Sequence, residues 1–154
     1  MINSELQTLI SGWFDDLTIV FEGKQYLTIT IPKEKLRDLI LKLKNEEDTS
    51  FDYLFCLTGV DNMPSHLSVY YHLESTKHRH IIALVTKTED RENVDIDTVS
   101  DIYPTAIFHE REAYDLLGIN FVGHPDLRRL FMTEDWVGYP LRKDYVDEAN
   151  LIFR

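Results

Sequence analysis

Three strand-like runs follow one another in the middle of the chain, and they constrain its fold more than any other feature. They cover residues 51–60, 67–74 and 79–86, and turns containing "MPSH" and "STKH" separate them. The second run alternates apolar and polar residues, and the third is rich in β-branched residues at its centre. We therefore expect three strands of a sheet in this region.

The segments before these runs predict two helices and a hairpin. Residues 3–12 carry apolar residues at helical spacing, and residues 32–48 open with a proline and continue as an apolar stripe. Between them, residues 17–31 contain two strand-like runs around a polar "EGKQ" turn. The order α-β-β-α-β-β-β predicts a two-layer α+β domain with helices on one face of a mixed β-sheet.

The segment after the predicted sheet begins with a polar loop, residues 88–97. Residues 98–118 then predict a short helix followed by a longer one at about 104–117, which Gly118 ends at its C-terminus. We assign residues 1–118 to the α+β domain, and this domain includes the helix at about 104–117.

The remaining residues, 119–154, are expected to form an extended, irregular tail that docks on a partner or on its own domain. From residue 118 onward the chain holds three of the six glycines and two of the five prolines, without the period of a helix or a strand. The segment has too many large side chains for ordinary disorder, and a long irregular segment in a compact protein usually has a function. Its large groups are Phe121, Leu127, Leu130, Phe131, Trp136, Tyr139, Leu141 and Tyr145.

Charge and cysteine content narrow the classes of partner. The formal net charge of −11 disfavours nucleic acid and an anionic bilayer as direct partners. No run approaches 18 apolar residues, so we expect no direct membrane insertion. Cys56 is the only cysteine, which rules out an internal disulfide and a cysteine-ligated iron–sulfur cluster built from this chain.

Glu110 lies at the centre of the apolar arc of the helix at 104–117. A carboxylate at such a position is costly unless it is paired or protonated. If a buried arginine pair satisfies it, Glu110→Gln should weaken folding or assembly by about 3–5 kcal/mol. Arg111 and Asp115 are four residues apart and are expected to pair along the helix. The arginines that could fold back on Glu110 are Arg128, Arg129 and Arg142.

Two other interpretations of this region remain open. Glu110 could serve a small stand-alone enzyme as a general acid or base, with His109 or His124 beside it. We favour the structural role, because neither a second carboxylate at a defined spacing nor a nucleophile accompanies Glu110. A metal site has less support, since "HEREA" has Ala113 where the H-E-x-x-H motif needs its second histidine. The remaining candidate metal ligands are His72, His78 and His80.

The run "HEREAYDLLGINFVGHPDLRRLFMTEDWVGYPLRKDY", residues 109–145, closely resembles the signature of the 30 kDa subunit, also called the C subunit, of NADH:quinone oxidoreductase (respiratory complex I). The resemblance implies a non-catalytic scaffold subunit of the peripheral arm, on the cytoplasmic side of the bacterial inner membrane. Its implied partners are the large quinone-site subunit (D type) and the iron–sulfur subunits. NADH, FMN, Fe–S clusters and quinone would then be bound by other subunits, and this chain would bind none of them.

The resemblance also assigns assembly and docking roles to a set of residues from the helix and the tail. These are Glu110, Arg111, Glu112, Asp115, Gly118, Gly123, His124, Pro125, Asp126, Leu127, Arg128, Arg129, Trp136, Pro140, Leu141, Arg142, Lys143, Asp144 and Tyr145. The sequence departs from the family pattern at Phe108, Phe131 and Tyr139, which blurs the partner surface that is implied. The small subunits of membrane-bound nickel–iron hydrogenases share this signature, so such a complex is the alternative within the family.

Overall fold

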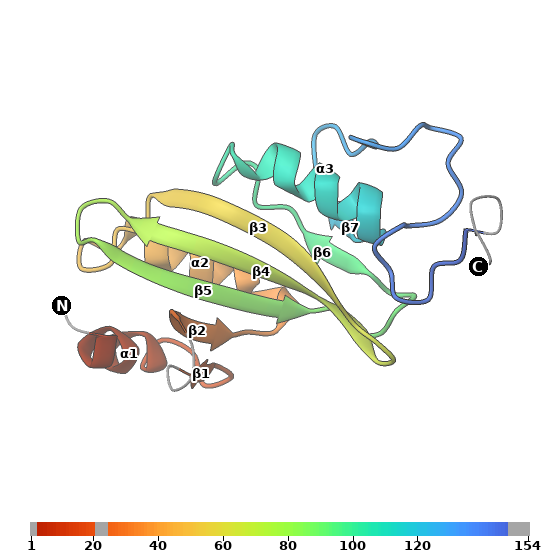
Figure 1. Cartoon of the computed structure of the whole chain (residues 1–154). Helices are drawn as coiled ribbons and strands as arrows, with labels where there is room; N and C mark the ends of the chain where they lie inside the picture. The colour runs from red at the N-terminus through yellow and green to blue at the C-terminus, as the bar shows by residue number, and fades with distance from the viewer. Residues whose placement is uncertain (1–2, 21–24, 148–154) are drawn as a thin grey trace.

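The computed structural model describes residues 3–20 and 25–147 of the 154-residue chain. Its α-helices, its single-turn 3-10 helix (η1) and its strands follow one another in an α+β order (Figure 1). They are α1 (Asn3–Ser11), β1 (Thr18–Val20), β2 (Leu27–Thr30), η1 (Lys33–Lys35), α2 (Leu36–Asn45), β3 (Tyr53–Asn62), β4 (His66–Ser75), β5 (His80–Lys87), β6 (Asp95–Asp97), α3 (Ala106–Leu117) and β7 (Asn120–Val122).

The main sheet has five strands in the order β1-β2-β5-β4-β3. Strands β3, β4 and β5 form an antiparallel meander, and β2 joins β5 in parallel, so the sheet is mixed, as predicted. Strands β1 and β2 pair antiparallel and confirm the arms of the predicted hairpin. Most of its "EGKQ" turn lies outside the described residues.

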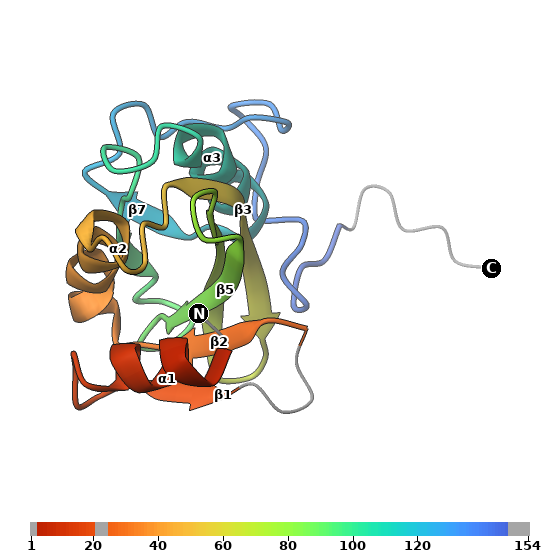
Figure 2. The same cartoon turned by 90° about the vertical axis from the view of Figure 1, so that its left-hand side faces the viewer.

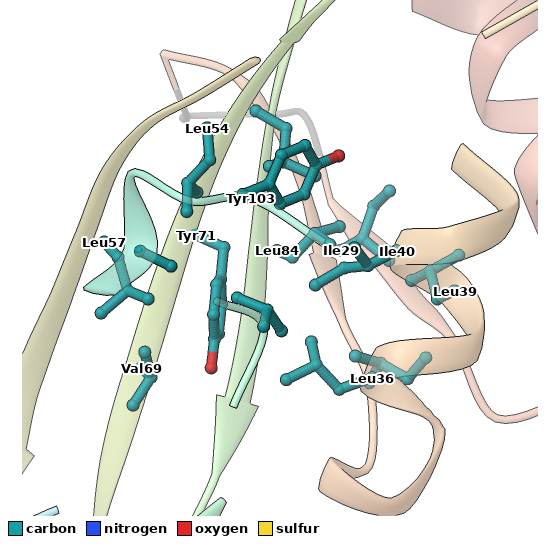
Figure 3. Close-up of a cluster of buried hydrophobic side chains, with 14 of the residues drawn as sticks. Ile29, Leu36, Leu39, Ile40, Leu54, Leu57, Val69, Tyr71, Leu84 and Tyr103 are labelled. Carbon is teal, nitrogen blue, oxygen red and sulfur yellow. The ribbon is translucent and has the colours of Figure 1, made fainter. Parts of the chain in front are cut away.

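The core lies between the sheet and the helices. One rung of the sheet runs through Ile29, Leu84, Tyr71 and Leu57 on four successive strands, and all four side chains are buried. Figure 2 shows α2 and α3 on the same side of the sheet. Figure 3 shows the buried face of α2 turned toward this rung. The apolar stripe of that helix consists of Leu36, Leu39, Ile40 and Leu43.

Two details of the predicted secondary structure are wrong. The short helix expected before α3 is a series of turns, because Tyr103 and Thr105 donate side-chain hydrogen bonds to the carbonyls of residues 51 and 54. The polar loop at 88–97 contains β6, which pairs in parallel with β7 through Ile96 and Phe121. Three-residue strands are too short to show a period in the sequence.

Candidate functional site

Helix α3 and the described part of the tail, residues 119–147, form one continuous unit (the α3–tail unit), drawn in teal and blue in Figure 1. The helix ends at Gly118, whose φ of 75° lies in the left-handed region and whose N–H donates to the carbonyl of Tyr114. The ring of Tyr139 lies directly against this glycine, and a Cβ at residue 118 would come within 2.6 Å of it. Glycine therefore allows both the helix end and the close approach of the tail.

Glu110 is fully buried, as its position on the helix predicts, but no arginine within residues 3–20 and 25–147 pairs with it. Its carboxylate accepts hydrogen bonds from the backbone N–H of Val99, at 2.8 Å, and from the hydroxyl of Thr98. Nε2 of His124, with its side chain also buried, lies 3.8 Å from Oε2. The predicted partnership with Arg128, Arg129 or Arg142 is therefore wrong: the turn that precedes α3 supplies the hydrogen bonds instead.

The carboxyl group of Glu110 ionises less readily in the folded chain than it does in water. Burial raises its pKa to about 7, while the hydrogen bonds from Thr98 and Val99 act in the opposite direction. Since no buried arginine would be left unpaired, the predicted cost of 3–5 kcal/mol for Glu110→Gln does not apply. The full burial of the side chain also argues against an acid or base that must reach a substrate.

Asp115 attaches the first part of the tail to α3. Its buried Oδ2 accepts the backbone N–H groups of residues 130, 131 and 132 at 3.0, 2.6 and 3.0 Å. Its Oδ1 accepts Nη1 of Arg129 at 3.0 Å. Burial of Asp115 opposes ionisation, but these four donors together hold the pKa of the carboxyl below its usual range.

Arg111 does not pair with Asp115 along the helix, which corrects the second predicted ion pair. It reaches across to the tail and donates to the carbonyls of Arg128 and Arg129 at 3.2 and 3.1 Å. The i, i+4 spacing brings two side chains near each other, but the tail offers both of them better-placed partners.

Two arginines of the tail turn inward onto backbone carbonyls. Arg129 donates through Nη2 to the carbonyls of Trp136 and Gly138, both at 3.0 Å. Arg142 donates through Nε to the carbonyl of Leu117 at 2.6 Å, at the end of α3. Both guanidinium carbons lie over the ring of Tyr139, at 5.3 and 5.1 Å from its centroid. These contacts gather residues 129–142 of the tail around one aromatic ring.

The "PLRKDY" segment is attached to the sheet by a carboxylate that the sequence analysis missed. Asp61, buried at the end of β3, accepts the N–H of Lys143 at 2.8 Å and pairs with Arg91, which also binds Asp144 at 2.9 Å. The hydrogen bond from Arg91 is the main cause that lowers the pKa of Asp61. In the sequence, the signal for this site was the charged residue Asp61 next to the apolar strand-like run 51–60.

The turn at His124 is held by both of its ring nitrogens. Nδ1 accepts the N–H of Asp126 at 2.9 Å, so Nε2 carries the proton and donates to the carbonyl of Ile107 at 3.0 Å. The other predicted positions do not gather at one point. Those on the exposed side are Glu112, Gly123, Pro125, Asp126, Arg128, Leu141, Lys143 and Asp144, and the half-buried ones include Leu127, Trp136, Pro140 and Tyr145.

Several large hydrophobic side chains of this unit are exposed to solvent. Large hydrophobic side chains protrude from α3 and the tail, with exposed fractions between 59% and 86%. They are Phe108, Phe131, Val137, Leu141 and Val146. The buried ion pairs shape the backbone and the apolar groups face solvent, an arrangement suited to binding a protein rather than to reacting with a substrate.

Neither a metal site nor a membrane span is found in the described parts of the chain. No group of three or more His, Cys, Asp or Glu side chains within residues 3–20 and 25–147 is placed to hold a metal ion. His72 instead contacts the rings of Tyr26 and Phe55, while His78 and His80 stack on each other. Over the same residues, no helix has the length and apolar character needed to cross a bilayer.

The curated proteins that the chain resembles include C/D subunits and C subunits of NADH-quinone oxidoreductase. The chain is 51% identical, over 122 residues, to the C/D subunit of NADH-quinone oxidoreductase from Phocaeicola vulgatus, and the match covers 79% of this chain but only 23% of that protein. It is 36% identical, over 136 residues, to the C subunit of NADH-quinone oxidoreductase from Chlorobium phaeobacteroides, with 86% and 81% covered. The chain thus spans about a quarter of the C/D relatives and most of the Chlorobium phaeobacteroides protein.

A solved structure and a family model agree with these relatives. A chain of the membrane-bound sulfane sulfur reductase, described as an archaeal respiratory membrane complex, superposes with a TM-score of 0.80 at 25% identity, covering 95% of this chain and 86% of that one. The family model for "Respiratory-chain NADH dehydrogenase, 30 Kd subunit" matches residues 29–150. The chain therefore belongs to the family of the 30 kDa subunit, or C subunit, of respiratory-chain NADH dehydrogenase.

Proposed function

We propose that this chain is a non-catalytic scaffold subunit in the peripheral arm of a bacterial, proton-translocating NADH:quinone oxidoreductase. It docks on the large quinone-site subunit (D type) and lies near the iron–sulfur subunits, on the cytoplasmic side of the membrane. Other subunits carry NADH, FMN, the Fe–S clusters and quinone. The joint name of the C/D relatives supports the D-type partner, because the two subunits occur there in one protein.

The observation that carries the proposal is the contrast between the two sides of the α3–tail unit. Its charged signature residues turn inward, while five large apolar side chains turn outward. Exposed apolar groups on a rigid backbone lose little conformational entropy on binding. We propose that residues 119–154 are the docking tail, and that the signature residues act by holding its shape.

A second complex remains a candidate because of the structural neighbour. The superposed chain belongs to a membrane-bound sulfane sulfur reductase, so a chain of this fold is also part of a different respiratory complex. In a complex of that kind, or in a nickel–iron hydrogenase, the same apolar surface would meet an equivalent large subunit. The subunits that copurify with the chain distinguish these cases.

The experiment is copurification of the tagged chain from gently solubilised native membranes, with mass spectrometry as the readout. The wild-type chain should recover the D-type subunit together with iron–sulfur subunits. Phe108→Asp and Phe131→Asp place charges on the proposed surface and should each reduce that recovery at least tenfold. Met63→Asp is the matched control, because Met63 is 51% exposed but lies in the β3–β4 turn, outside the α3–tail unit. Equal recovery with all four chains would contradict docking through this surface.

A further inference from the structure

A groove in the last part of the tail has the features of a side-chain binding site. It has a volume of about 310 Å³, room for on the order of ten water molecules. Its walls are the rings of Tyr139 and Tyr145 together with Val137 and Val146, and two charged residues, Arg142 and Asp144, also line it. Val137 is 86% exposed and Val146 66% exposed, so the apolar walls are open to solvent.

Arg142 brings a positive charge to this groove that is not paired with a carboxylate of residues 3–20 or 25–147. Its Nε and Nη1 donate to the carbonyls of Leu117 and Arg91, which are neutral groups. No hydrogen-bond acceptor for its Nη2 is found among residues 3–20 and 25–147, and no carboxylate of those residues lies within 4.0 Å of the guanidinium. The nearby carboxylate of Asp144 is paired with Arg91 instead.

This contrasts with Arg129 of the tail and Arg91 of the loop between β5 and β6, which are both paired with carboxylates. Arg129 has Asp115 and Arg91 has Asp61, each at hydrogen-bond distance. The half-buried guanidinium of Arg142 lies between aromatic walls, and its Nη2 has no acceptor among the described residues. Such a group favours a planar anion with apolar atoms beside it. Asp144, the acidic residue of the lining, is already paired with Arg91, so the charge of Arg142 is the one that an acidic group can approach.

We propose that the groove receives an acidic side chain of the partner subunit. Its carboxylate pairs with Nη2 of Arg142, and the aliphatic part of the same segment packs between Tyr139 and Tyr145. The inference rests on the proposed docking function and adds the chemistry of one contact to it. The pair is shielded by the tyrosine rings, so it contributes to specificity as well as to affinity.

The test uses Val137, because its exposed side chain can be changed without touching the contacts of Arg142. Val137→Asp puts a negative charge at the rim and should reduce recovery of the partner from native membranes at least tenfold. Val137→Lys removes the same apolar surface but adds a positive charge, and it should recover at least tenfold more of the partner than Val137→Asp does. With Val137→Lys, a zero-length carbodiimide should also join the new amine to a carboxylate of the partner, identified by mass spectrometry.

Each outcome bears on one proposal. Equal loss with Val137→Asp and Val137→Lys, without a cross-link, would show an apolar contact and overturn the acidic occupant. Wild-type recovery with both variants, again without a cross-link, would overturn the groove as a binding site while leaving the docking function intact. Failure of the wild-type chain itself to recover a large subunit would instead refute the proposed function.

Discussion

Asp115→Asn should release the tail from α3 while leaving the rest of the domain folded. The carboxylate accepts three backbone N–H groups on one oxygen and Arg129 on the other. An asparagine in either orientation places its NH₂ group against donors, opposite the arginine or opposite the three N–H groups. Breaking a buried charge pair of this kind costs about 3–5 kcal/mol.

This cost converts into a measurable change in amide hydrogen exchange. The amides of Leu130, Phe131 and Met132 all donate to Asp115, so they report directly on opening of the tail. At about 1.4 kcal/mol per factor of ten, their exchange should accelerate by roughly two to three and a half powers of ten. Amides in the centre of β4 should keep their protection, because their hydrogen bonds are made within the sheet.

Asp126→Asn is the matched control for this experiment. Asp126 lies in the same part of the tail and pairs with Arg128, but both side chains are more than half exposed. An exposed pair contributes about 0–1 kcal/mol, so exchange at residues 130–132 should change less than tenfold. The reasoning would be refuted if Asp115→Asn left those three amides as protected as in the wild-type chain.

Three further predictions concern buried or constrained positions. Since the folded-state pKa of Glu110 is raised from 4.5 to about 7, its contribution to stability is fully present below about pH 4.5 and is lost as pH rises through 7. Urea unfolding of wild type and Glu110→Gln should therefore show wild type losing about 3 kcal/mol relative to the variant between pH 4.5 and 8. Gly118→Ala should lower the unfolding free energy by about 1–3 kcal/mol, because its φ is positive and its Cβ would meet a tyrosine ring at 2.6 Å. Gly12→Ala, where the Cβ meets only carbonyl oxygens at 3.6 and 3.9 Å, should cost less in the same denaturation assay. Asp61→Ala should leave Arg91 with Asp144 alone and the N–H of Lys143 without its acceptor, cost about 1–3 kcal/mol and accelerate amide exchange across "PLRKDY".

The parts of the fold with a long period could be predicted from the sequence. Strands β3, β4 and β5 and helices α2 and α3 each carry several apolar residues at regular spacing, and all five are present. Strands β6 and β7 were missed because each has three residues, and they are held together by pairing across the chain. Local pattern does not report such a long-range contact.

The buried position of a charged residue in the candidate site could be predicted from the sequence, but its hydrogen-bond partners could not. The position of Glu110 on the helix wheel correctly indicated burial, yet its hydrogen bonds come from the turn at 98–99. The choice between an arginine and a backbone N–H depends on the path of the loop, which the sequence pattern does not determine. The exposed apolar side chains were not predicted either: of the five, only Leu141 was among the residues predicted to dock.

The joint between the tail and α3 has a consequence for exchanging segments between relatives. Much of the tail's shape depends on acceptors outside it, on Asp115 and Leu117 of α3 and on Asp61 of β3. A tail transplanted alone into a distant relative would keep its own sequence but meet a different set of acceptors. The helix, the end of β3 and the tail therefore form the smallest module that a chimera can inherit, and evolution should vary them together.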